Sequence, residues 1–349
     1  MLISALLVAF APAAGCSSIG YYFQAVSGQM ELTRKTQPIA KVMANPDTGA
    51  ELKGKLERVV EMRDFASREL HLPDNGSYRS YADIGRSYVV WNVFAAPEFS
   101  VKPQEWCFLF AGCVEYRGYF SKAGADKFAS DLREQRYDVF IGGVPAYSTL
   151  GWLDDPVLST FVQYPDADIA ELMFHELAHQ LVYVQGDSTF NESFAVAVER
   201  EGVERWLAVH GSEAQRRAFE QKQVRRQAFA ELVASYRDQL AQLYAEPLDV
   251  QQMRARKERV LTQMRAAYGR LKQSWDGFAG YDYWFEQPLN NAQLASVSIY
   301  TQLVPAFQRM LRDNGGDLER FYAEAKRLAA LPKAQRDAEL AGVLQGASG

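Results

Sequence analysis

Residues 175–179 read His-Glu-Leu-Ala-His, and the architecture of the chain can be inferred outward from them. Residues four apart lie on the same face of a helix, so His175 and His179 can bind one Zn²⁺ ion together. Glu176 lies beside the first ligand, where it can act as general base toward a zinc-activated water. The chain has only four histidines, so two of them rarely take this spacing by chance. The segment therefore predicts a helix that carries two ligands of a zinc site.

The residues around this motif have the pattern of a buried helix that ends at Gly186. Apolar residues recur at helical spacing, which lets the helix pack against a core. They are Ile169, Leu172, Met173, Leu177, Leu181 and Val182. Asp166 and Asp168 place negative charge near the helix N-terminus, where the macrodipole favours it. A second helix is expected from about residue 191 to residue 210.

Glu192 lies in the first turn of that second helix, which can pack back across the first. Two imidazoles, one carboxylate and a fourth position for water make up the ligand set of an open catalytic zinc site. We therefore expect one Zn²⁺ per chain, with Glu192 as the third ligand. Asp187 and Glu199 are the alternatives. Glu199 also fits a residue that orients a ligand histidine, or an ion-pair partner of an arginine such as Arg200.

These motifs resemble those of the gluzincin metallopeptidases, in which His-Glu-x-x-His is followed by Asn-Glu at the start of the next helix. Residues 191–195, Asn-Glu-Ser-Phe-Ala, are similar to the Asn-Glu-Gly-Phe-Ala segment of zinc aminopeptidases. Thermolysin-like enzymes place an aspartate four residues after the ligand glutamate, where this chain has Val196. The resemblance covers about residues 170–200. It implies that Asn191 and Glu199 lie beside the ligands, with Glu199 taking the part of that aspartate.

Most of the chain also resembles a bacterial family of zinc aminopeptidases. The segments that carry this likeness are Trp106-Cys107 through Gly112-Cys113, Arg117-Gly118-Tyr119-Phe120, residues 147–152 (Tyr-Ser-Thr-Leu-Gly-Trp), and Asn291-Ala292 before Tyr300. The resemblance implies an aminopeptidase that acts on peptides. The motif spacing alone does not distinguish exopeptidase from endopeptidase. An exopeptidase needs a carboxylate for the free amine of its substrate, and Glu199, Glu201 and Asp187 are candidates.

A zinc peptidase also needs a group that stabilises the oxyanion of its tetrahedral intermediate. His210 lies eighteen residues after Glu192 in one expected helix, or about 27 Å away at 1.5 Å per residue. That distance excludes it and leaves the tyrosines. Tyr300 is the first candidate because it follows Asn291 in a segment shared with the family. The alternatives are Tyr147, Tyr183, Tyr281 and Tyr283.

The N-terminal segment indicates export. Residues 1–15 are apolar or small, too few to span a bilayer stably and typical of a secretory signal peptide. The Ala-Gly-Cys ending at Cys16 resembles a bacterial lipobox, although no Lys or Arg precedes Arg34. We predict a periplasmic protein anchored to the inner leaflet of the outer membrane through a lipid on Cys16. A cleaved soluble signal and a buried N-terminal helix are the alternatives.

Composition agrees with an exported enzyme. The net charge is −5 and no basic run alternates with aromatic residues, so no nucleic-acid partner is expected. In an oxidising compartment Cys107 and Cys113, which have five residues between them, could close a short loop as a disulfide. Two buried free thiols are the alternative.

We expect a mostly helical α+β fold with three regions. These are a signal peptide over 1–15, a zincin-like catalytic domain with a small β-sheet over 16–210, and a helical region over 211–349 that packs on the catalytic part. An amphipathic helix is expected at 47–70 and strands at 88–94, 137–141 and 158–164. A zincin can hold its substrate along a strand edge, here within 142–150 or 158–164, unless both segments are ordinary sheet strands.

The C-terminal region reads as helical throughout. Residues 213–245 and 250–274 are rich in charged and helix-forming residues and predict a long antiparallel hairpin over about 213–274, whose charges we take as a solvated face. A final helical part is expected over 292–344. The sequence thus predicts a zinc aminopeptidase. The alternatives are a zinc endopeptidase and a cell-envelope assembly or binding protein with a vestigial site, for which the hairpin would be the partner surface.

Overall fold

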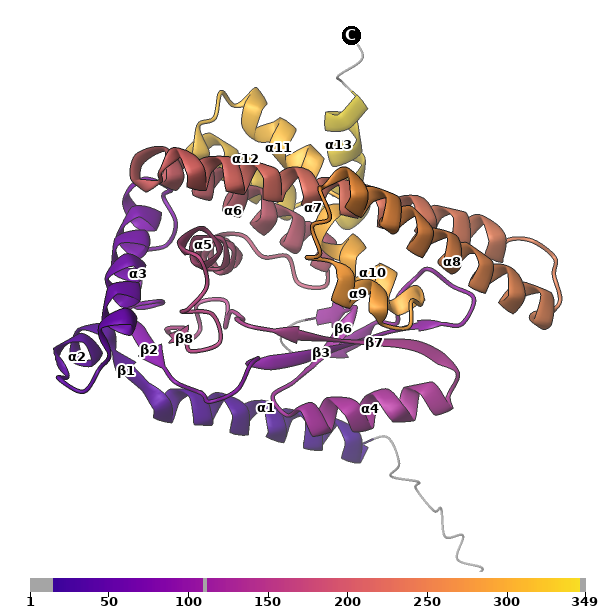
Figure 1. The fold of residues 1–349 in the computed structure, drawn as a ribbon, viewed down its shortest axis with the longest axis horizontal. Coiled ribbons are helices and arrows are strands. Elements are labelled where there is room, and N and C mark those ends of the chain that lie inside the picture. The colour runs from indigo at the N-terminus through magenta and orange to yellow at the C-terminus, as the bar shows by residue number, and fades with distance from the viewer. Residues whose placement is uncertain (1–14, 109–111, 346–349) are drawn as a thin grey trace, which may run out of the picture.

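The computed structural model describes residues 15–108 and 112–345 (Figure 1). The predicted signal peptide lies outside the described residues except for residue 15, and the side chain of Cys16 also lies outside them. Within the described chain, no helix is both long enough and apolar enough to cross a membrane.

The fold is α+β and mostly helical, as expected, and its elements follow one another in two blocks. The block before the His-Glu-x-x-His motif contains α1 (Gly15–Lys35), β1 (Thr36–Pro38), α2 (Ile39–Ala44), α3 (Ala50–Arg68), β2 (Ser80–Ala82), β3 (Val90–Pro97), β4 (Trp106–Phe108), β5 (Gly112–Val114), β6 (Tyr116–Tyr119), α4 (Lys122–Glu134), β7 (Tyr137–Val144) and β8 (Val157–Leu158). The block from the motif onward contains α5 (Asp166–Leu181), α6 (Ser188–His210), α7 (Glu213–Tyr244), α8 (Val250–Ser274), α9 (Asp282–Glu286), α10 (Asn291–Thr301), α11 (Val304–Asp313), α12 (Leu318–Ala329) and α13 (Lys333–Gln345).

The main sheet is antiparallel, with strand order β6-β3-β7. The central strand, β3, is an almost continuous apolar run, as expected for a strand that is buried on both faces. Its residue Val93 pairs with Arg117 of β6 on one side and with Ile141 of β7 on the other. A smaller sheet has the order β1-β2-β8, and β4 and β5 form a hairpin. The strands expected at 88–94 and 137–141 are confirmed as β3 and β7.

The strand expected at 158–164 is wrong. Only residues 157–158 form a strand, and hydrogen-bonded turns follow, such as the one from Tyr164 N to Phe161 O. Phe161 and Val162 are fully buried in the main core. Their apolar character therefore reflects core packing within turns that lead into α5, and the segment offers no strand edge for a substrate.

The largest hydrophobic core draws on residues from Leu32 to Leu340, including Phe174 of α5, Phe194 of α6 and Phe321 of α12. A second core fills the space between α7, α8 and the segment 285–294. The predicted hairpin is confirmed as α7 and α8, and the expected final helical part as α10 to α13. The division of the chain into regions at residue 210 stays a prediction.

Two long elements enclose the motif helix from opposite sides (Figure 1). Helix α7 lies above α5 and α6 in this view, and α1 runs along the opposite side beneath the main sheet. The Gln24 side chain joins α1 to β6, since it donates to Gly118 O at 3.3 Å and accepts from Phe120 N at 3.0 Å.

Candidate metal centre

Helices α5 and α6 bring three ligand groups together. His175 and His179 lie one turn apart on α5, and Glu192 is the fifth residue of α6, which begins at Ser188 and so places Glu192 in its second turn, one turn later than expected. The Nε2 atoms of the two histidines are 3.1 Å apart, and Glu192 Oε2 lies 3.1 Å from His175 Nε2 and 3.6 Å from His179 Nε2. In the described chain these are the residues whose positions suit a metal ion.

The three groups fit a tetrahedral zinc ion. Zinc–nitrogen bonds of about 2.0–2.1 Å place two tetrahedral ligands about 3.3 Å apart, close to the three separations found. Two imidazole nitrogens and a carboxylate oxygen that face one another at this range are best satisfied by a cation between them. His179 and Glu192 are buried, and the side chain of His175 is only 13% exposed.

Electrostatics keep Glu192 ready to bind a cation. Burial raises the pKa of this carboxyl, but the charges and hydrogen bonds of His179 and His175 outweigh burial and lower the pKa to about 2. For His175, burial lowers the pKa, and the hydrogen bonds to Glu192 and Glu199 raise it well above its ordinary value. The site thus presents an ionised carboxylate among imidazoles.

Glu199 orients His175, the first of the two candidate ligand histidines. Its Oε2 lies 2.7 Å from His175 Nδ1, and its Oε1 accepts a hydrogen bond of 2.7 Å from Arg226 Nη1. A hydrogen bond at Nδ1 sets the tautomer in which Nε2 keeps its lone pair for a metal. Asp187 and Glu199 therefore do not serve as the third ligand in this arrangement, which uses Glu192.

Arg226 is a residue of the site that the sequence did not single out. It belongs to α7, whose charges were expected to form a solvated face, yet it reaches Glu199 across 27 residues of sequence. Lys222 of the same helix also contacts the motif helix, with Asp168 at 2.6 Å and a close ion pair to Glu171. The expectation fails here because the inner face of α7 packs on α5 and α6.

Glu176 is buried beside the candidate ligands and does not belong to the group of side chains that could hold the metal ion. Its burial raises its pKa, and the neighbouring charges of His175 and His179 only partly oppose this. The side chain lines the same cavity as the two histidines and Glu192. A carboxylate placed there, with a raised pKa, can accept a proton from a water in that cavity.

The cavity has a volume of about 590 Å³ and opens onto the metal-binding atoms. Tyr116, Tyr147, Tyr183 and Tyr300 line it. Burial and the charge of Glu192 raise the pKa of Tyr300 well above its ordinary value, so its hydroxyl stays protonated. The same two causes raise the pKa of Tyr116 and Tyr183. The structure thus keeps Tyr300 among the candidate hydrogen-bond donors and adds Tyr116.

Two of the sequence-based tyrosine candidates lie elsewhere. Tyr281 stacks on Phe229 with ring centroids 4.2 Å apart, and Tyr283 is 75% exposed. Neither lines the cavity. His210 stacks on Trp206 at 3.9 Å, in agreement with its exclusion from the site.

Other candidates hold the two helices in place. Asn191 bonds the backbone of Val184 twice, at 2.7 and 2.8 Å, and so fixes the loop between α5 and α6. Asp187 caps α6 at Phe190 N and pairs with the buried Arg336 of α13. Both therefore fix the start of α6, the helix that carries Glu192.

Three further sequence candidates have structural partners. Glu201 pairs with Arg205 one turn later at 2.7 Å, so it faces away from the metal-binding atoms. Cys107 and Cys113 form a disulfide that joins β4 to β5. Phe108, next to this disulfide, lines the cavity.

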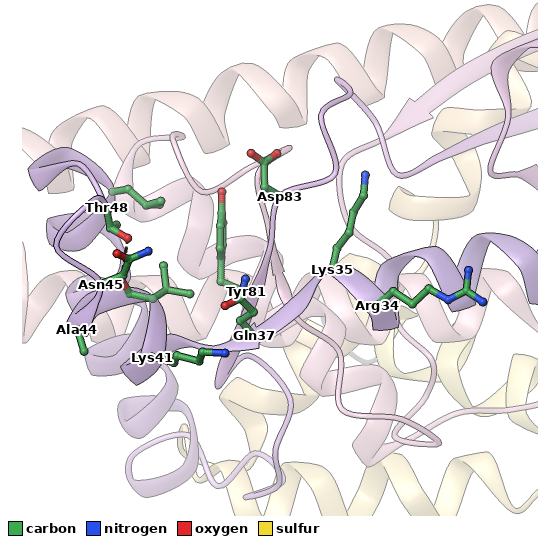
Figure 2. A pocket seen from close by; sticks show the side chains of 11 residues that line it. Arg34, Lys35, Gln37, Lys41, Ala44, Asn45, Thr48, Tyr81 and Asp83 are labelled. Atoms are coloured by element: carbon green, nitrogen blue, oxygen red, sulfur yellow. Dashed lines mark hydrogen bonds between the residues drawn. The ribbon is translucent and has the colours of Figure 1, made fainter.

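A separate hollow lies at the end of α1 (Figure 2). Arg34, Lys35 and Lys41 line it, and Asp83 is the carboxylate among its described lining residues. It contains neither imidazole nor thiol and lacks the ligand set of a hydrolytic metal site. Of these two hollows, the cavity between α5 and α6 is the one whose described lining includes the His175, His179 and Glu192 group.

A family model described as "Putative aminopeptidase" matches residues 20–340 of the chain. No curated protein and no solved structure matches it.

Proposed function

The chain belongs to this family of putative aminopeptidases, and on that premise we propose that it is a zinc aminopeptidase that hydrolyses N-terminal peptide bonds. His175, His179 and Glu192 would hold the ion. The observation that carries the proposal is the convergence of two imidazole nitrogens and one carboxylate oxygen within 3.1–3.6 Å, in a cavity that also holds Glu176.

Zinc in this position supplies Lewis acidity, which lowers the pKa of a water and polarises the scissile carbonyl. Glu176 takes the proton of the attacking water and passes it to the leaving amine. The hydrogen bond between Glu199 and His175 holds the imidazole in its ligand orientation. A tyrosine hydroxyl, with Tyr300 as first candidate, donates a hydrogen bond to the oxyanion.

The charges around the cavity support action at an N-terminus. Among the described residues that line it, Arg226 is the one Lys or Arg side chain, and its guanidinium is bound to Glu199. The carboxylates of Glu171, Glu176 and Glu192 also line the cavity. A free α-carboxylate would meet no unpaired cationic side chain among these residues, so the cavity offers a C-terminus no side chain to bind it.

The test compares the zinc-loaded protein with its Glu176→Gln variant on a mixed peptide library, with products identified by mass spectrometry. Loss of single N-terminal residues with wild type alone supports the proposal, and internal cuts would make the protein an endopeptidase. Glu176→Gln should keep one zinc per chain, while His175→Ala should lose it. No cleavage by zinc-loaded wild type would favour the assembly or binding role.

We further propose that a lipid on Cys16 anchors the protein to the periplasmic face of the outer membrane. The support is the apolar segment 1–15 and its Ala-Gly-Cys ending. The test is mass spectrometry of the N-terminal peptide from the membrane fraction of bacteria that express the full chain. Cys16→Ala should remove the acyl mass and release the protein. An unmodified Cys16 in the mature protein would contradict the anchor.

A further inference from the structure

We propose that the cavity at the metal centre selects peptides whose first side chain is bulky and apolar, of the phenylalanine and leucine class. We also infer that α1 forms a wall of the subsite that holds this side chain. The inference rests on the proposed aminopeptidase function and specifies its substrate class.

The cavity has a charged half and an uncharged half. The charged and metal-binding side chains that line it all come from α5, α6 and α7. The described lining residues from α1, the sheet and the loop 145–150 carry no charge. A charged substrate side chain against this second half would lose water without gaining a partner, which opposes its binding.

Aromatic rings from four separate segments build the uncharged wall. Tyr21 of α1 stacks on Phe108 of β4 with ring centroids 5.0 Å apart. Phe120, just after β6, packs edge-on against Tyr147 at 5.6 Å. Ala25 lies one turn after Tyr21 on α1 and also lines the cavity, where its small side chain leaves space. Such a wall buries an apolar side chain well.

The wall is held firmly, so its shape can discriminate between side chains. Gln24 bonds α1 to the backbone on both sides of Tyr119, as described above. Gly28 lies directly on the ring of Phe120, and a Cβ at this position would come within 2.1 Å of the ring. Only glycine allows this approach. The helix therefore stays against the sheet and keeps Ala25 at the cavity.

The expected preference follows from the apolar area that the substrate would bury. A substrate that fully buries a leucine or phenylalanine side chain should have a kcat/KM about 10–100-fold higher than the substrate with alanine at the same position. Aspartate and lysine at the same position should fall below alanine because the wall offers them no counter-charge.

The experiment uses the zinc-loaded full chain and fluorogenic amides of Phe, Leu, Ala, Asp and Lys. The variant Ala25→Phe fills the subsite and should lower kcat/KM for Phe and Leu amides about tenfold or more, while the Ala amide changes less than about twofold. Val26→Phe is the matched control, because Val26 is the next residue of α1, is 59% exposed and does not line the cavity.

A second readout does not depend on turnover. Calorimetric titration of the Glu176→Gln variant should show tighter binding of Phe-Ala-Ala than of Ala-Ala-Ala, and Ala25→Phe in the same background should abolish the difference. Zinc content and circular dichroism check that each variant is folded. Equal rates across the five amides, or equal effects of Ala25→Phe and Val26→Phe, would overturn this inference alone. No hydrolysis of any amide by zinc-loaded wild type would overturn the proposed function and this inference with it.

Discussion

Replacing Arg226 with methionine should weaken zinc binding although Arg226 is no metal ligand. The guanidinium donates to Glu199 at 2.7 Å, and Glu199 in turn holds His175 Nδ1 at 2.7 Å. Burial raises the pKa of Glu199, while the charge of Arg226 and then the hydrogen bond of His175 lower it to about 2. Methionine keeps much of the apolar stem but leaves the buried carboxylate without its cation.

The magnitude follows from the exposure of the two partners. Removing one member of a fully buried ion pair costs about 3–5 kcal/mol. The side chain of Glu199 is 5% exposed but that of Arg226 is 28% exposed, so solvent reduces the expected loss of unfolding free energy to about 2–3 kcal/mol. Loss of a residue that orients a metal ligand weakens metal binding by about 10–100-fold.

Two assays separate these effects. Urea denaturation of the zinc-free protein gives the change in unfolding free energy, and competition with a fluorescent chelator gives the zinc Kd. Arg217→Met is the control on the same helix, because Arg217 and its partner Glu213 are 66% and 72% exposed. It should cost less than about 0.5 kcal/mol and leave zinc affinity unchanged. If Arg226→Met behaved like Arg217→Met in both assays, the link from α7 to the metal centre would be refuted.

Three other perturbations test the fold and the site. Asp187→Ala should lower the unfolding free energy by about 3–5 kcal/mol, because it removes the cap of α6 and leaves Arg336 buried at 3% exposure without its partner. Urea denaturation measures this loss, and Glu324→Ala, which breaks an exposed pair with Arg327, is the control. Equal losses of unfolding free energy in the two variants would contradict the prediction. Burial raises the pKa of the Asp155 carboxyl to about 6, whereas the pKa of an aspartate in the unfolded chain is about 4. Between these values the unfolded chain has lost the proton that the folded protein keeps. The unfolding free energy of wild type should therefore fall by up to about 3 kcal/mol as pH rises from about 4 to about 6. Asp155→Asn should lack this loss, and a wild-type-minus-variant difference that stays flat from pH 4 to pH 7 would argue against it. Zinc at about a thousand times its Kd should raise the unfolding free energy by about 4 kcal/mol, which thermal melts with and without zinc can measure. In the same melts His179→Ala should show no stabilisation by zinc. Removal of zinc with a chelator should abolish hydrolysis by wild type.

The helical parts of the molecule were predictable because their signals are local. Apolar residues at helical spacing around residues 175–179 predicted the motif helix, but the helix ends at Leu181, five residues before the expected end at Gly186. The charged segments 213–245 and 250–274 predicted the hairpin that the structure contains. The prediction of a strand at 158–164 was wrong because Phe161 and Val162 are buried within turns. Apolar residues indicate burial, and burial alone does not specify the backbone conformation.

The candidate metal site likewise has a part that local sequence predicts and a part that it does not. Two ligands four residues apart on one helix are brought together by the backbone itself, so the sequence determined the His175–His179 pair, and the short loop to α6 made Glu192 a reasonable third ligand. Arg226 on Glu199 and the wall that Tyr21 and Ala25 form on the cavity depend on helices that pack across the chain from distant positions. Such contacts come from side-chain packing over the whole core and leave no periodic trace in the sequence. The tertiary structure alone therefore decided which charges support the site and which side chains shape its cavity.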